Sequence, residues 1–232
     1  GTEYARERVY SPVRGQTLVK NTDLPVEDLG MMLLYAAPEA TVANEAAGRV
    51  LARHLRNRAF DTLRTEEQLG YAAGGLTTTL QDHPMVGFYI QTPVKGPVAM
   101  LERFEAFAGE YALMLGELTE DQFANLKSGV LTQLTEPPTN LSDEAGPFIG
   151  DWNRERYNFS SRAEMIAAVG AVSLEAMRDY YRATVLSSEP SRILIQMRGE
   201  RWQAEPFATI EDATVIESVE AFHEQMPLQP LD

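Results

Sequence analysis

The chain has 232 residues, of which 44% are hydrophobic and 23% are charged, and this composition is ordinary for a globular protein with one large domain or two small ones. Its formal net charge of −14 argues against nucleic acid as a partner, because affinity for nucleic acid comes mainly from Lys and Arg that neutralise phosphates. There are no cysteines, which excludes disulfides and Cys-ligated metal sites.

The sequence carries no sign of a membrane span. Its longest markedly apolar stretch, residues 31–37, is far too short to cross a bilayer. No basic and apolar segment ending in small residues opens the given sequence, so we expect no signal peptide within it. Residue 1 is Gly rather than Met, so we expect a processed or cloned fragment.

The first 60 residues predict strands followed by a long helix. Val9–Lys20 predicts a strand or a strand pair, and the continuous apolar run Leu29–Ala36 predicts a buried strand. A helix is expected from Pro38-Glu39 to about Arg58. Its apolar stripe is formed by Val42, Ala46, Val50 and His54. On that stripe, His54 is interpreted as a packed, hydrogen-bonded residue rather than a ligand.

The middle of the chain predicts a hairpin and then a helix. Leu69–Leu80 predicts one strand, Gln81–Pro84 a turn, and Met85–Val94 the partner strand. From Val98 to Leu115, apolar residues step by three and four positions, which is typical of an amphipathic helix.

Capping residues predict the next two helix starts. Thr119 with Gln122 has the spacing of a capping box, and Pro137-Pro138 stops the helix that follows. Ser142 is expected to cap the next helix.

The last third of the chain predicts two helices, a strand and a tail. Ser161 with Glu164 is interpreted as a second capping box, and Ser173 starts a further helix. The alternating stretch Ser191–Arg198 predicts a closing strand. The rest is expected to be irregular.

This order of elements predicts an α+β fold, with an antiparallel sheet and helices packed on one face. Strands and helices come in runs, whereas a doubly wound parallel sheet needs strict alternation. We expect one α+β domain over residues 1–199. Residues 200–232 form an acidic extension, packed on the domain or partly irregular, with eight acidic residues against Arg201.

The segment Leu63–Tyr71 places Arg64 and Tyr71 seven positions apart, across a predicted helix-to-strand junction. Arg offers planar, forked donors suited to a carbonyl or a carboxylate, and Tyr offers one hydroxyl donor. Two such donors that converge on a carbonyl would stabilise an oxyanion. From the pattern alone, the simpler interpretation is favoured, namely a surface arginine and a tyrosine on a strand face.

The sequence predicts no metal site and no covalent nucleophile of its own. His54, His83 and His223 are separated by 29 and 140 positions, and neither HExxH nor HxxEH occurs. A serine nucleophile in a GxSxG elbow is also absent.

A family resemblance changes the interpretation of Arg64 and Tyr71. The stretch Phe60–Tyr71, which contains Arg-Thr-Glu-Glu-Gln-Leu-Gly-Tyr, resembles the signature of the last domain of the pitrilysin and insulin-degrading-enzyme family, the inverzincin zinc metalloendopeptidases. The similarity covers roughly Asp28 to the C-terminus. Further similar segments are Asn125–Leu134 before Glu136-Pro137-Pro138, Trp152 with Tyr157-Asn158-Phe159, and Phe222–Leu231.

The resemblance implies a fold and a role. Members of this family contain four homologous α+β domains in two halves that close around a peptide, with zinc held by HxxEH and a distal Glu in the first domain. The last domain lacks zinc and forms part of the chamber wall. Its Arg and Tyr, here Arg64 and Tyr71, bind substrate, and Tyr71 assists catalysis by stabilising the tetrahedral intermediate.

The resemblance also implies partners and a location. We expect a peptide substrate, the N-terminal half of the same polypeptide as partner, and zinc as cofactor of the full-length enzyme; the fragment alone is expected to bind no metal and to be inactive. A homo-oligomer stays open. The periplasm is favoured and the cytoplasm stays open. The alternative is a stand-alone, inactive scaffolding or interaction subunit with the same fold.

Overall fold

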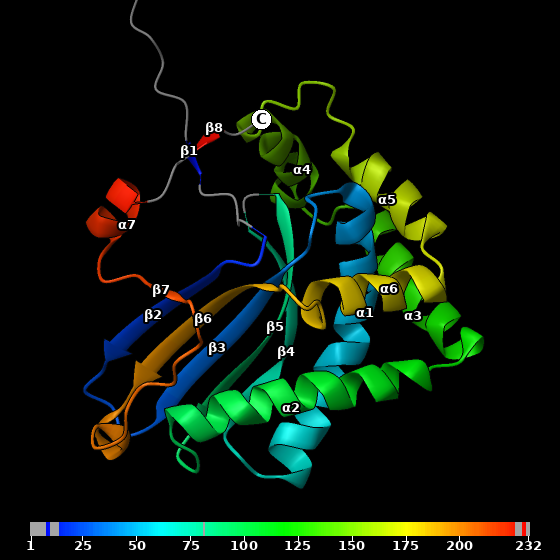
Figure 1. Ribbon diagram of the computed structural model, residues 1–232. Helices are drawn as coiled ribbons and strands as arrows, with labels where there is room; N and C mark the ends of the chain where they lie inside the picture. The colour runs from blue at the N-terminus through cyan, green and yellow to red at the C-terminus, as the bar shows by residue number, and fades with distance from the viewer. Residues whose placement is uncertain (1–7, 10–13, 81, 226–228, 231–232) are drawn as a thin grey trace, which may run out of the picture.

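The computed structural model describes residues 8–9, 14–80, 82–225 and 229–230, which form a mixed sheet with helices gathered on one face (Figure 1). The strands are β1 Arg8–Val9, β2 Thr17–Asp23, β3 Leu29–Ala36, β4 Ala72–Leu80, β5 His83–Thr92, β6 Ser191–Arg198, β7 Thr214–Val215 and β8 Gln229–Pro230. The helices are α1 Val42–Ala59, η1 Phe60–Glu66, α2 Pro97–Gly116, α3 Glu120–Thr135, α4 Leu141–Asn153, α5 Ser161–Ala171, α6 Leu174–Val185, η2 Glu200–Trp202 and α7 Val219–Gln225.

The main sheet has six strands in the order β4-β5-β3-β6-β2-β7, and β1 pairs with β8 separately. β3 lies at its centre, antiparallel to both neighbours, with Leu33 opposite Phe88 of β5 and Leu194 of β6. β3 and β6 occupy the residues that the sequence predicts for them. The predicted hairpin forms as β4 and β5, but His83 and Pro84 belong to β5 rather than to the turn, and Gln81 lies outside the described residues.

One edge of the sheet is parallel, whereas the predicted α+β fold has an antiparallel sheet. β2 pairs in parallel with β6, with Leu18 opposite Ile193, and also with β7. The sheet is therefore mixed, although the hairpin and the pairs around β3 are antiparallel. The predicted first strand is shifted to Thr17–Asp23, and its residues 10–13 lie outside the described part of the chain.

The core lies between the sheet and the helices. Alternate residues of β3 are buried toward the helices, because successive side chains of a strand point to opposite faces. These residues are Leu29, Met31, Leu33 and Tyr35. Helices α1, α2 and α6 contact the strands on this face, and α3 and α5 contact α1 from outside (Figure 1). The Phe88 ring of β5 meets the Phe107 ring of α2 edge to face, with centroids 5.4 Å apart.

Helix α1 begins three residues later than Pro38-Glu39 predicts. Thr41 is its N-cap, with extended backbone angles, and the Thr41 hydroxyl accepts a hydrogen bond of 3.1 Å from the backbone N–H of Asn44. Of the predicted stripe, Ala46, Val50 and His54 are buried, whereas Val42, in the first turn, is exposed.

Two of the predicted helix starts are confirmed. The Thr119 hydroxyl accepts from the backbone N–H of Gln122, and the Gln122 side chain accepts from the backbone N–H of Thr119, which completes the capping box of α3. Ser173 caps α6 through the backbone N–H of Ala176.

Two other capping predictions are wrong. Asn140, not Ser142, caps α4, because the Asn140 side chain accepts from the backbone N–H of Asp143 at 3.0 Å. For α5 the residue before the helix is Ser160 rather than Ser161. Its hydroxyl donates to the Glu164 carboxylate instead of capping the backbone.

The C-terminal segment is more ordered than the sequence predicts. It contains η2, β7 and α7, and the buried Ala208 exchanges two backbone–side chain hydrogen bonds with Gln196 of β6. Residues 226–228 and 231–232 lie outside the described part of the chain. A domain boundary at residue 199 stays a prediction.

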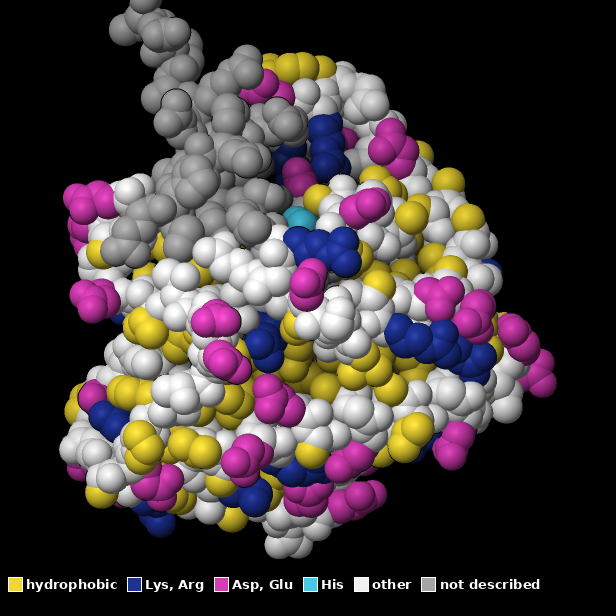
Figure 2. All heavy atoms as spheres, in the orientation of Figure 1, with side chains coloured by type: hydrophobic (Ala, Val, Ile, Leu, Met, Phe, Trp, Pro, Cys, Tyr) yellow, Lys and Arg dark blue, Asp and Glu magenta, His cyan; other side chains and the backbone are white. Residues whose placement is uncertain are grey.

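Charged side chains are distributed over the surface. On the face shown in Figure 2, acidic and basic side chains of the described residues are interspersed, and the basic ones form no single large patch. None of the described helices has the length and apolar character that crossing a membrane requires.

Candidate functional site

Arg64 lies on an unusual helical segment. Helix α1 continues without a break into the π-helix η1, where the backbone N–H of Glu67 donates to the carbonyl oxygen of Thr62 at 3.0 Å. Short π-helical segments within helices are frequent at functional sites. Leu63 in η1 is fully buried, which anchors the segment, whereas Arg64 is exposed.

The Arg64 side chain is oriented by an aromatic ring. Its guanidinium carbon lies 4.7 Å from the centroid of the Phe60 ring, one turn earlier. This cation–π contact fixes the direction of the side chain, and a guanidinium stacked on a ring keeps its in-plane N–H donors available for a ligand.

Between Arg64 and Tyr71 the chain turns sharply toward the sheet. Gln68 has a positive φ of 53°, which non-glycine residues adopt uncommonly. The backbone N–H of Leu69 then donates to the carbonyl oxygen of Leu63 at 3.0 Å, and the Thr92 hydroxyl donates to the carbonyl oxygen of Leu69. These bonds hold the turn against the end of β5.

Gly70 lets the turn approach the sheet closely. A Cβ atom at residue 70 would lie 1.9 Å from the carbonyl oxygen of Gln91, so no other residue fits without a backbone shift. Tyr71 follows immediately and precedes β4, whereas the sequence predicts a strand from Leu69. The Tyr71 side chain is 76% exposed.

A salt-bridge network fastens the same turn to α2. The Arg103 guanidinium donates to both carboxylate oxygens of Glu67, the shortest contact being 2.6 Å, and to Glu110 at 2.8 Å. Hydrogen bonding to Glu67 is the largest influence that raises the pKa of Arg103, with Glu110 adding to it. This clamp is not predictable from the sequence, because no local pattern links Glu67 to a residue 36 positions away.

Both predicted site residues are therefore exposed side chains on a rigid, well-packed segment. Neither lines any of the larger cavities. The cavity nearest to the turn has a volume of about 440 Å³ and lies against the other side of η1, between Arg58, Thr65 and Met114. Arg64 and Tyr71 thus form an open surface rather than an enclosed active site.

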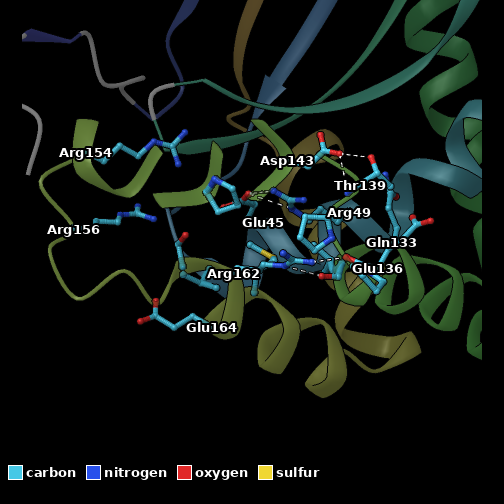
Figure 3. A pocket seen from close by; sticks show the side chains of 17 residues that line it. Glu45, Arg49, Gln133, Glu136, Thr139, Asp143, Arg154, Arg156, Arg162 and Glu164 are labelled. Atoms are coloured by element: carbon cyan, nitrogen blue, oxygen red, sulfur yellow. Dashed lines mark hydrogen bonds and ion pairs between the residues drawn. The ribbon is translucent and has the colours of Figure 1, made fainter. Parts of the chain in front are cut away.

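A second cavity lies elsewhere, between α1, α4 and α5, with a volume of about 540 Å³ (Figure 3). Many of its charges are satisfied within the protein. Arg49 pairs with Glu45 at 2.9 Å, and Arg162 donates to the carbonyl oxygens of Leu134 and Glu136 at 2.9 and 2.8 Å. Because these charged side chains are paired within the protein, a structural role is favoured for this cavity.

Two arginines beside this cavity connect distant loops. Arg154 and Arg156, from the loop after α4, each approach the carboxylate of Asp82 to 3.2 Å. Asp82 lies at the tip of the β4–β5 hairpin with a positive φ of 64°. The two ion pairs tie the hairpin tip to the helical layer.

Two of the three histidines are buried and hydrogen-bonded within the protein. His54 Nδ1 is hydrogen-bonded to the Tyr111 hydroxyl at 2.9 Å, and burial lowers the pKa of His54 to about 4, with a smaller effect from the positive charge of Arg58. The His83 ring donates to the carbonyl oxygen of Ala37 at 2.6 Å. The interpretation of His54 as a packed residue is confirmed. No cluster of potential metal ligands occurs in the part of the chain that the structure describes.

Several known proteins are similar to this chain in sequence. The sequence profile of the PQQ synthase PqqF-like C-terminal lobe, domain 4, matches residues 50–149, a stretch that includes Arg64 and Tyr71. Protease 3 of Escherichia coli K12 is 30% identical over 169 residues, which cover 73% of this chain and 18% of that protein. The A-factor-processing enzyme of Saccharomyces cerevisiae is 24% identical over 67% of this chain. The chain thus spans less than a fifth of the length of Protease 3.

Solved structures have the same fold. The crystal structure of pitrilysin superposes with a TM-score of 0.91 at 24% identity, over 100% of this chain and 25% of that chain. A peptidase M16 inactive domain from Pseudomonas fluorescens superposes with a TM-score of 0.61 at 14% identity, over 90% of this chain and 48% of that one. Together with the sequence matches, these similarities show that the chain belongs to the pitrilysin family of M16 peptidases, in which it corresponds to a C-terminal domain.

Proposed function

We propose that the chain is the non-catalytic C-terminal domain of a zinc metalloendopeptidase, that it forms part of the substrate chamber, and that Arg64 and Tyr71 act on the bound peptide. The observation that carries this proposal is the presentation of the two side chains. Both are exposed, and both are carried by a turn that is fixed by Leu63, Gly70 and the Arg103–Glu67 clamp.

Pre-organised donors of this kind favour a transition state over a ground state. The Arg64 guanidinium, oriented by Phe60, would donate to a backbone carbonyl of the peptide. The Tyr71 hydroxyl would donate to the oxygen that gains negative charge when water attacks the scissile carbonyl. Because the donors are held in place before the reaction, no reorganisation is needed as charge develops.

His54 and His83 are not available as ligands of a catalytic zinc ion. His54 and His83 are buried, and each has a ring nitrogen engaged with the protein, to Tyr111 and to Ala37. His223 lies on α7. In the proposal the zinc therefore belongs to another domain of the complete protein. The 232-residue chain alone is expected to bind no catalytic zinc and to cleave no peptide, which metal analysis and a peptidase assay on the isolated chain test directly.

The second candidate is an inactive scaffolding subunit with the same fold. The similarity to a structure described as a peptidase M16 inactive domain supports this second candidate. The upstream coding sequence separates the two. An HxxEH motif several hundred residues before Gly1 in the same reading frame supports the peptidase, whereas a start codon close to Gly1 supports the scaffold. A periplasmic location is part of the first proposal.

The experiment for the proposal replaces Arg64 in the complete enzyme. Arg64→Ala should lower kcat/KM for peptide hydrolysis by about 10²-fold, because a charge-assisted hydrogen bond to the peptide is lost. Arg64→Lys should restore little of it, since an ammonium group lacks the forked donors.

Arg56→Ala provides the matched control, because Arg56 is an exposed arginine of α1 two turns before Arg64. It should leave kcat/KM unchanged. Zinc content and the circular dichroism spectrum should not differ among the three variants. Equal kinetics for Arg64→Ala and Arg56→Ala would return Arg64 to the role of an ordinary surface residue.

A further inference from the structure

Helix α4 and the loop after it expose an unusual concentration of large apolar side chains. Six such residues between positions 141 and 159 are 39–79% exposed. They are Leu141, Phe148, Ile149, Trp152, Tyr157 and Phe159, which we call the α4 apolar surface. Single exposed apolar residues are common, but a contiguous group of this size marks an interaction site.

Helix α4 exposes its apolar side chains and buries a polar one, which is the reverse of the usual arrangement in an amphipathic helix. Leu141, Phe148 and Trp152 recur at the spacing of one helical stripe, which normally faces the interior. Here the stripe is exposed, and the buried residue of α4 is Asp151, which is 3% exposed. The Asp151 carboxylate accepts a hydrogen bond of 3.3 Å from the backbone N–H of Ser161. Polar contacts thus hold α4 to its own domain and leave its apolar stripe facing outward.

The aromatic rings of this surface are arranged before any partner binds. Trp152 and Tyr157 meet edge to face with centroids 5.7 Å apart, and Phe148 and Phe159 lie 6.3 Å apart. The loop that carries Tyr157 and Phe159 is sharply bent, with positive φ values of 56° at Glu155 and 53° at Phe159. Rigid aromatic anchors of this kind are typical of the centre of a protein interface.

The structural relatives of this chain are longer than the chain itself. This chain matches 25% of the pitrilysin chain and 48% of the Pseudomonas fluorescens peptidase M16 chain. Each of those polypeptides therefore has at least one further stretch of comparable length beside the matched domain. A lipid surface is disfavoured, because a net charge of −14 repels anionic headgroups.

We propose that the α4 apolar surface is the contact through which this domain packs against another domain of the same polypeptide. The inference rests on the proposed function only in that the chain is one domain of a longer protein. It does not require that Arg64 or Tyr71 act on a substrate. Trp152 and Phe148 are the central anchors, because they lie on the exposed stripe and each pairs with a ring of the following loop.

The test is hydroxyl-radical footprinting of the complete polypeptide, with oxidation mapped by mass spectrometry. Trp152 is 63% exposed in this domain, whereas Trp202 is partly buried with its ring nitrogen inaccessible. If the surface is packed, Trp152 should oxidise no faster than Trp202 at every protein concentration. Oxidation of Trp152 several-fold faster than Trp202 would overturn the proposal.

Other partners give different results. Protection of Trp152 that is lost on dilution would identify a second copy of the chain and contradict an intramolecular contact. A complete coding sequence without a further domain would contradict it as well. Peptidase activity is measured on the same samples. If the enzyme is active but Trp152 is oxidised freely, only the proposal that the α4 apolar surface is packed is rejected. If Trp152 is protected but Arg64→Ala does not change activity, only the proposed role of Arg64 is rejected.

A pair of variants provides an independent measurement on the complete polypeptide. Replacing both Phe148 and Trp152 by Ser should lower Tm or split one unfolding transition into two, because the domains lose their apolar contact. Leu113→Ser is the control, since Leu113 is 73% exposed on α2, outside the α4 apolar surface. Identical Tm values for the double variant, the control and the wild type would contradict the proposal.

Discussion

At the scale of single residues, the burial of His54 links folding to pH. The ring is hydrogen-bonded to Tyr111 in the core, and burial lowers the pKa of His54 from 6.5 to about 4. The unfolded chain therefore binds a proton between these values that the folded chain does not bind. The stability contributed by neutral His54 is complete above pH 6.5 and is lost as the pH falls toward 4.

We predict that acidification from pH 7 to pH 4 lowers the free energy of unfolding by on the order of 3 kcal/mol through His54, because each unit of pKa shift corresponds to about 1.4 kcal/mol. Urea titrations at a series of pH values measure this slope. His54→Gln removes the titrating group and should flatten the profile in this range, even if it lowers stability at pH 7. An equally steep profile in the variant would contradict the assignment.

The two site residues show what the sequence can and cannot predict at this scale. Arg64 and Tyr71 are identified by the similarity of their segment to a family signature. Their mutual arrangement could not be predicted, because it depends on the positive φ of Gln68 and on the close approach of Gly70 to Gln91. Backbone features of this kind are imposed by tertiary contacts rather than by local propensity.

At the scale of elements, the turn that carries Tyr71 depends on α2. The Arg103 side chain is only 14% exposed and connects Glu67 of the turn with Glu110, which lies about two turns further along α2. Arg182 provides a comparison, because it also pairs with two acids, Glu175 and Asp179, but is 55% exposed. Burial and forked geometry should make the first network stronger.

We predict that Arg103→Met lowers the stability of the protein by about 1–2 kcal/mol, whereas Arg182→Met changes it by less than about 0.5 kcal/mol. In hydrogen exchange, Arg103→Met should also increase deuterium uptake at residues 67–71. Glu67→Gln should produce the same local effect, and the double variant should add little. Additive effects of the two substitutions would show that the ion pair does not act as a unit.

Element types were largely predictable, whereas some helix starts were not. Strands β3 and β6 follow from continuous or alternating apolar residues, and the α3 capping box follows from local side-chain chemistry. The start of α4 is misplaced by two residues, because Asn140 and Ser142 are both suitable capping residues and Asn140 takes the role. The start of α5 is misplaced by one residue, because the Ser160 hydroxyl binds the Glu164 carboxylate rather than the helix backbone. The amphipathic pattern of α4 also cannot tell whether its apolar stripe faces this domain or a neighbour.

At the scale of the whole molecule, the sheet has a parallel edge that no local pattern predicts. β2 and β6 are parallel, with Thr17 opposite Arg192, and β7 adds to the outer edge. Such long-range pairing is decided by the packing of the entire chain. The helical layer on one face, by contrast, follows from the runs of strands and helices along the sequence.

The pitrilysin family gives the whole molecule its context. The chain matches 18% of Protease 3, so most of such an enzyme lies outside it. The domain exposes two distinct surfaces, the segment with Arg64 and Tyr71 and the α4 apolar surface, and we propose a different role for each. The first is proposed to face the substrate, and the second is proposed to face a neighbouring domain.

The most direct test of the central claim is the rate of peptide hydrolysis by Tyr71→Phe in the complete enzyme. This substitution removes one hydroxyl from a side chain that is 76% exposed and leaves the packing unchanged. We predict that kcat/KM falls by about 10²-fold, mainly through kcat, with no change in zinc content. Tyr157→Phe, which removes a hydroxyl from another exposed tyrosine, should keep the wild-type value. Equal kcat/KM values for Tyr71→Phe, Tyr157→Phe and the wild type would contradict the proposed role of this domain in catalysis.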